Sequence, residues 1–194
     1  MLLAAILVRI MSATAFAVPD SQKLGPYMVS FDINSTYRAQ IAQPTSTETA
    51  NAYQMRLFVD NSTFATIVIT EYAEPTDATL KVHKSLMPME MILREGLNAS
   101  FAVDRTIDGK EGFLVTAEPL KVTDAAISTV YRAMYWLDSK SCECGPLSVG
   151  KANVMITSTF PKDITESLLS SLHIVKGEAA AQAPAPGGQV QSPA

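Results

Sequence analysis

The chain has 194 residues, of which 47% are hydrophobic, and its formal net charge is −4. This length and apolar content suit one domain with its own core. The mild acidity, without any run of basic residues, argues against a nucleic-acid-binding surface or an anionic-membrane binder. We therefore expect a single domain with no nucleic acid among its partners.

The first residues are typical of an export signal. A short apolar run, Leu2–Val8, precedes an Ala-Phe-Ala triplet at 15–17, which is the small-x-small pattern that signal peptidase cleaves. This run is too short to cross a hydrocarbon layer of ~30 Å, which needs about 20 residues. We expect 1–17 to be a signal peptide and 18–25 a linker, with an uncleaved tether or a buried N-terminal strand as the alternatives. The mature chain would then be extracellular or in the cell envelope, with no membrane span.

Alternating apolar and polar residues predict two β-hairpins in the first half of the chain. The first joins Tyr27–Ile33 to Tyr37–Ile41, and the second joins Met55–Val59 to Phe64–Tyr72. The polar segment 43–52 between them predicts a loop.

A helix is predicted from the possible N-cap residues Thr76 and Asp77 to Arg94, with Gly96 as its stop. Pro88 falls inside this helix and cannot donate a backbone hydrogen bond. We therefore expect two short helices, with Pro88 in the first turn of the second.

Two further hairpins are predicted after this helix. Phe101–Arg105 and Phe113–Ala117 flank an Asp-Gly turn, and Ile127–Leu137 is followed by Ala152–Phe160. The second hairpin encloses the loop that carries both cysteines.

The last predicted element is a helix near Asp163, whose carboxylate would form a capping box with Glu166. Four apolar residues follow at helical spacing on one face: Ile164, Leu168, Leu169 and Leu172. We expect Leu168, Leu169 and Leu172 to bury against strand residues such as Val154, Ile156 and Trp136 or its neighbours.

This order of elements predicts an α+β fold over residues 26–176. Its antiparallel sheet would consist of successive hairpins, covered by a central kinked helix and a C-terminal helix. The Ala-, Pro- and Gly-rich tail 177–194 cannot bury enough apolar surface to offset its ordering entropy, so we expect it to be disordered.

Three segments resemble the PsbP-like superfamily, which includes the lumenal photosystem subunit, a Ran-binding nuclear import factor and exported bacterial lipoproteins. Residues 152–175 are similar to its closing strand and helix, 29–41 to its opening strands, and 105–115 to an internal turn and returning strand. The resemblance implies the fold. It implies no catalytic residues, because the superfamily shares none.

Cys142 and Cys144 flank one residue in a loop that continues as Gly-Pro. Outside the cytoplasm such a pair can close a small disulfide ring. Soft-metal binding and redox activity are the alternatives, although no helix N-terminus is predicted there to lower a thiol pKa.

Other possible metal ligands are the helix residues Met87, Met89 and Met91 and the histidines His83 and His173, both on predicted helices. Only Met87 and Met91 share a helix face, so we expect the methionines to pack rather than to bind copper. Neither histidine has ligand partners at metal-binding spacing. We expect no metal and no cofactor.

Three Asn-x-Ser/Thr triplets, at Asn34, Asn61 and Asn98, are possible N-glycosylation sites. The first two fall at predicted turn tips. A binding surface is therefore expected to avoid those turns, and to lie at the opposite end of the sheet or at the loop 142–150 with the Pro88 helix. The loop is the first choice, because a tethered, partly rigid loop loses less entropy on binding than a flexible one.

The sequence contains no nucleophile elbow and no phosphate-binding glycine loop, so we expect no enzymatic activity, although a hydrolase remains a third hypothesis. We expect an exported, non-enzymatic accessory or binding protein whose partner is an envelope protein or surface component. The alternative is an extracytoplasmic soft-metal or redox protein that uses Cys142 and Cys144.

Overall fold

The computed structural model describes residues 20–74, 80–120, 129–138, 140–141 and 148–177. The helices are α1 (Leu80–Glu95) and α2 (Lys162–Ser171). The strands are β1 (Asp20–Leu24), β2 (Tyr27–Phe31), β3 (Arg38–Ile41), β4 (Thr45–Ser46), β5 (Ala50–Phe58), β6 (Phe64–Tyr72), β7 (Leu97–Ala99), β8 (Val103–Ile107), β9 (Lys110–Pro119), β10 (Val130–Trp136), β11 (Lys140–Ser141), β12 (Ser148–Val149), β13 (Ala152–Ser158) and β14 (His173–Lys176).

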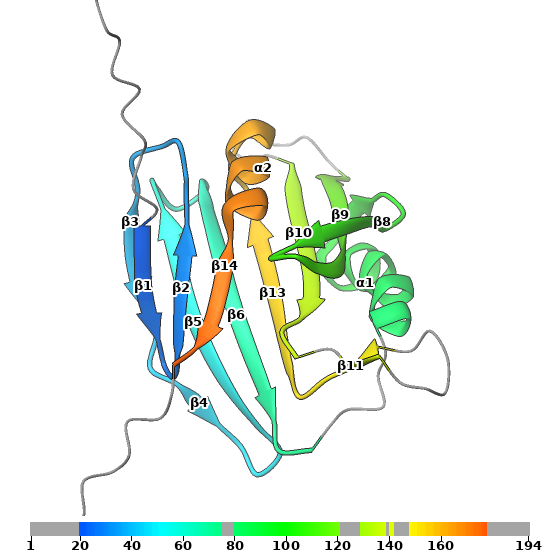
Figure 1. Ribbon diagram of the computed structural model, residues 1–194. Coiled ribbons are helices and arrows are strands. Elements are labelled where there is room, and N and C mark those ends of the chain that lie inside the picture. Colours follow the sequence, from blue (N-terminus) through cyan, green and yellow to red (C-terminus); the bar gives the residue numbers. More distant parts are fainter. Residues whose placement is uncertain (1–19, 75–79, 121–128, 139, 142–147, 178–194) are drawn as a thin grey trace, which may run out of the picture.

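A large antiparallel sheet runs in the order β3-β5-β6-β13-β10-β9-β7, with β4 paired to β5 and β8 paired to β9. Its neighbours β5–β6, β8–β9 and β10–β13 are antiparallel pairs that follow one another along the chain, as predicted. A smaller antiparallel sheet, β1-β2-β14, lies with α2 over one face of the large sheet (Figure 1). The predicted α+β class with antiparallel sheets is confirmed.

Two apolar clusters lie on opposite faces of the large sheet, because alternate residues of each strand point to opposite sides. On β10, Ala133 and Tyr135 join the cluster beneath the small sheet and α2. Met134 and Trp136 join the cluster beneath α1. The sheet is therefore covered on both faces along β10.

The expected hairpin between Tyr27–Ile33 and Tyr37–Ile41 is wrong. Strand β2 pairs with β1 and β14 in the small sheet, whereas β3 pairs with β5 in the large sheet. Strand β1 lies inside the segment 18–25 that was expected to be a linker. Its alternation is short, and Leu24 is its only fully buried residue. The segment 43–52 also contains β4 and the start of β5.

The expected division of the central helix at Pro88 is wrong. Helix α1 continues through Pro88 as one element. Its buried residues Leu80, Met87 and Met91 lie on both sides of the proline, so packing against the sheet holds the two halves together. This packing offsets the missing backbone hydrogen bond, a defect of about 3 kcal/mol.

Helix α2 confirms the predicted C-terminal helix, and Leu168 and Leu169 are buried in the cluster that contains Val154 and Ile156. Of Trp136 and its neighbours, Tyr135 lies in the same cluster, whereas Trp136 itself lies on the other face of the sheet, in the cluster beneath α1.

The expected capping box of this helix is also wrong. The N-cap residue is Pro161, without a side-chain cap, and Glu166 pairs with Arg105 of β8 instead. His173 lies in strand β14 and not in a helix, because the helix ends at Ser171.

Candidate functional site

A cavity of about 280 Å³ is lined by residues of both sheets. These residues lie at the end of the molecule where β6 and β14 end and β13 begins, and Figure 1 shows these strand ends. We call the cavity the inter-sheet cleft. The residues that give it polar character are Tyr27, Glu71, Asp138, Lys151 and Lys176. Strand register brings them together, since Lys176 is opposite Tyr27, and Glu71 is opposite Ala152, the residue after Lys151.

The charges of the inter-sheet cleft balance one another. Lys176 forms an ion pair with Glu71. The carboxylate of Asp138 accepts hydrogen bonds from the backbone N–H groups of Lys151, at 3.0 Å, and Ala152, at 3.0 Å. Lys151 Nζ donates to the carbonyl oxygen of Ala73 at 2.8 Å. Two acidic and two basic side chains therefore line the cleft in partnered positions.

Tyr27 is only 2% exposed and packs edge-on against Tyr53, with ring centroids 5.8 Å apart. Its hydroxyl has no hydrogen-bond partner among the residues that the structure describes. Burial, together with the negative charges of Glu71 and Asp138, raises the pKa of Tyr27. Glu71 also raises the pKa of Tyr27 by hydrogen bonding to the hydroxyl, although the pair does not meet strict hydrogen-bond geometry. The phenol stays protonated, beside the carboxylate of Glu71.

A second cavity of about 310 Å³ shares Glu71 and Lys151 with the inter-sheet cleft. It adds Glu48, Asn51 and Tyr72 to the lining. Within the described ranges, the side chains of Glu48 and Asn51 make no hydrogen bond to another residue. The two cavities therefore form one polar surface with unused donors and acceptors.

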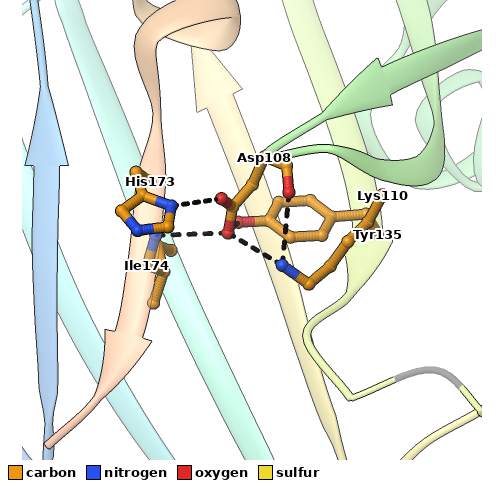
Figure 2. A network of polar contacts seen from close by, with 5 residues as sticks. All are labelled: Asp108, Lys110, Tyr135, His173 and Ile174. Carbon is orange, nitrogen blue, oxygen red and sulfur yellow. Dashed lines mark hydrogen bonds and ion pairs between the residues drawn. The ribbon is translucent and has the colours of Figure 1, made fainter.

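A separate polar cluster surrounds Asp108, in the turn between β8 and β9 (Figure 2). Its side chain is 3% exposed and accepts hydrogen bonds from the Ile174 backbone N–H at 3.2 Å and from the Tyr135 hydroxyl at 3.4 Å. Lys110 Nζ lies at 3.2 Å, and His173 Nδ1 at 2.7 Å. Burial and the Asp108 charge raise the pKa of Tyr135. This arrangement fixes the β8–β9 turn to β14, which is a structural role.

Another cavity, of about 620 Å³, lies between α1 and residues 99–102. The outer surface of α1 beside it is apolar, with Leu86 53%, Met89 54% and Leu93 77% exposed. Of its polar lining residues, Lys84 pairs with Asp104, and the others are exposed to solvent: Lys81, Ser85 and Ser100. Such a surface offers apolar contact but little directional recognition, so the smaller inter-sheet cleft is the better candidate for a specific site.

The possible glycan acceptors are all exposed in the structure. Asn34 follows the end of β2, and Asn61 precedes the start of β6. The opposite ends of these strands carry Tyr27 and Glu71, so both turns lie away from the inter-sheet cleft. Asn98 lies within β7. Glycosylation itself stays a prediction.

Among the other candidate ligands, Met87 and Met91 are buried under α1, whereas Met89 is exposed. The ring of His83 packs against Trp136, with centroids 6.2 Å apart. The described positions contain no group of three His, Cys, Asp or Glu side chains that could hold a metal ion. Cys142 and Cys144 lie outside the described residues.

Comparisons with protein-family models, with curated proteins and with solved structures find no match to this chain. The PsbP-like resemblance therefore stays a prediction. In the described part of the chain, no helix combines the length and the hydropathy needed to cross a bilayer.

Proposed function

We propose that this chain is an exported, non-enzymatic binding protein of the cell envelope, and that the inter-sheet cleft is its ligand site. The observation that carries the proposal is the Tyr27 hydroxyl, which is buried beside the cleft and makes no hydrogen bond of good geometry to any described residue, Glu71 included. A buried polar group left unsatisfied costs about 1–3 kcal/mol. A ligand that bonds to this hydroxyl recovers that free energy, so the feature favours binding.

The position of the cleft also supports this proposal. It lies at the end of the sheets away from Asn34 and Asn61, where a glycan would not obstruct it. The Ala-Phe-Ala triplet at 15–17 supports export. N-terminal sequencing of the protein recovered from its native host should give Val18 as the first residue. A chain that still begins at Met1 would contradict the expected cleavage.

The binding proposal is tested with low-mass compounds extracted from the native envelope. Amide resonances of the cleft residues in the purified protein should shift when the extract is added. Tyr27→Phe should weaken this response, whereas Tyr37→Phe should retain it, because Tyr37 contacts Asp20 outside the cleft. An extract that leaves the cleft resonances unchanged, or that shifts both variants equally, would exclude the cleft as the site.

A further inference from the structure

The chemistry of the cleft restricts the charge of its ligand. A cationic ligand would have to displace Lys176 from Glu71, and therefore break an existing ion pair. An anionic ligand would have to approach the carboxylates of Glu71 and Asp138, and Asp138 already accepts bonds from two backbone N–H groups. A cation would therefore break an ion pair of the folded protein, and an anion would meet the repulsion of two carboxylates.

A neutral, hydroxyl-rich ligand fits without that cost. Each hydroxyl group both donates and accepts, so one hydroxyl can bond to the Tyr27 phenol and another to a remaining lone pair of Glu71. Ile174 and Leu137 give the same cavity apolar surface, against which the C–H groups of a sugar ring can pack. The cavity volume of about 280 Å³ is close to the lower limit of ~300 Å³ for small-molecule sites.

The second cavity extends this surface beyond one ring. It begins at the shared residues Glu71 and Lys151 and continues to Asn51 and Glu48, whose side chains make no hydrogen bond within the described ranges. An amide and a carboxylate together present donors and acceptors to hydroxyl groups.

We infer that the ligand is a saccharide of at least two rings, with one ring in the inter-sheet cleft, the next in the second cavity, and the linkage beside Glu71 and Lys151. This inference rests on the proposed binding function and names the class of its ligand. Recognition is by hydrogen bonds to hydroxyl groups, and the Glu71–Lys176 ion pair stays intact.

Titration calorimetry and amide-resonance shifts of the purified protein test this with defined probes. The saccharides are glucose, N-acetylglucosamine and their β1,4-linked disaccharides, and the charged comparators are sodium acetate and ethylammonium chloride. A disaccharide should bind more tightly than its monosaccharide and shift resonances in both cavities. Tyr27→Phe should weaken the binding of both the monosaccharide and the disaccharide about tenfold, because one hydrogen bond is lost.

Asn51→Ala should weaken the binding of the disaccharide by a similar factor and leave the affinity for the monosaccharide unchanged, because only the second ring reaches Asn51. Tyr37→Phe is the matched control and should bind as the unmodified protein does. Should acetate or ethylammonium bind at the cleft while the saccharides do not, the saccharide inference is overturned and the proposed binding function stands. If no probe shifts the cleft resonances, the saccharide inference is again overturned. The proposed binding function is then tested separately, by the experiment with the envelope extract.

Discussion

The carboxylate of Asp108 lies 2.7 Å from Nδ1 of His173, a residue 65 positions later in the chain. This contact, with the bond from the Ile174 backbone N–H, fastens a hairpin turn to the C-terminal strand (Figure 2). Asp108 adopts a positive φ of 52°, which Asp tolerates better than most residues. The turn thus places a buried carboxylate where β14 has a free backbone donor.

Asp108→Asn should lower the free energy of unfolding by about 1–3 kcal/mol, because the charge-assisted bonds to His173, Lys110 and Ile174 are weakened. Asn keeps the tolerance for positive φ, so backbone strain does not contribute. Urea denaturation measures the loss. The control is Asp104→Asn, which breaks an ion pair with Lys84 but whose side chain is 74% exposed, and it should cost less than about 1 kcal/mol. Equal losses in the two variants would contradict the structural role of Asp108.

Gly25→Ala should be more destabilising than Gly96→Ala. Both glycines have positive φ, 61° and 66°, so each substitution carries the left-handed penalty of about 1–2 kcal/mol. At Gly25 the new Cβ would also lie 2.3 Å from a ring atom of Tyr53, whereas at Gly96 no heavy atom lies within 4 Å. Thermal and urea unfolding give the loss of stability in each variant. The difference between the two losses is the cost of the clash, because both variants share the backbone penalty. Comparable losses would show that Tyr53 can move away.

His83 should make the protein less stable as the solution becomes acidic. Burial lowers the pKa of His83, and the nearby Glu90 offsets this only in part. The folded protein therefore binds fewer protons than the unfolded chain below about pH 6.5, so stability is lost as pH falls through this range. Unfolding free energies at pH 7 and pH 5 measure the effect, and His83→Gln should reduce the difference between them. An NMR titration midpoint of His83 above 6.5 would be incompatible with this reasoning.

Pro88→Ala should stabilise the protein by about 1–3 kcal/mol, because alanine restores the backbone donor inside α1 and is the better helix former. Urea denaturation measures the gain. Ser85→Ala, also in α1 and exposed, should change stability by less than about 0.5 kcal/mol. A loss of stability in Pro88→Ala would mean that the proline ring makes contacts worth more than the missing hydrogen bond.

Local patterns in the sequence predict the elements of this fold but not all of their partners. The β5–β6 and β8–β9 hairpins are correctly predicted because an alternating strand, a turn and a second alternating strand follow directly in the chain. The same reasoning gives the wrong partner for strand β2. It has the same alternation, but its neighbours are β1 and the C-terminal β14, and no local pattern encodes that pairing.

The candidate site could not be predicted from the sequence, because it too depends on contacts between distant parts of the chain. In the sequence, Tyr27 looks like any other apolar residue of an alternating strand. Glu71 looks like an ordinary solvated charge at the end of a strand. Their chemistry depends on the burial of one hydroxyl and on the register that places Lys176 opposite Tyr27. The prediction that a binding surface avoids the turns at Asn34 and Asn61 is compatible with the position of this cleft, but it named none of the cleft residues and ranked the loop 142–150 first.

The pairing of β14 with β2 also determines when the chain can finish folding. The small sheet needs residues from both ends of the domain, since Ile174 lies opposite Val29. Contacts of such long sequence separation form late, because the loop between them must first be closed. Until β14 has been synthesised, one edge of β2 lacks its strand neighbour. In the proposed export, the chain would therefore stay incompletely folded, and competent for passage through a secretion channel, until β14 has emerged.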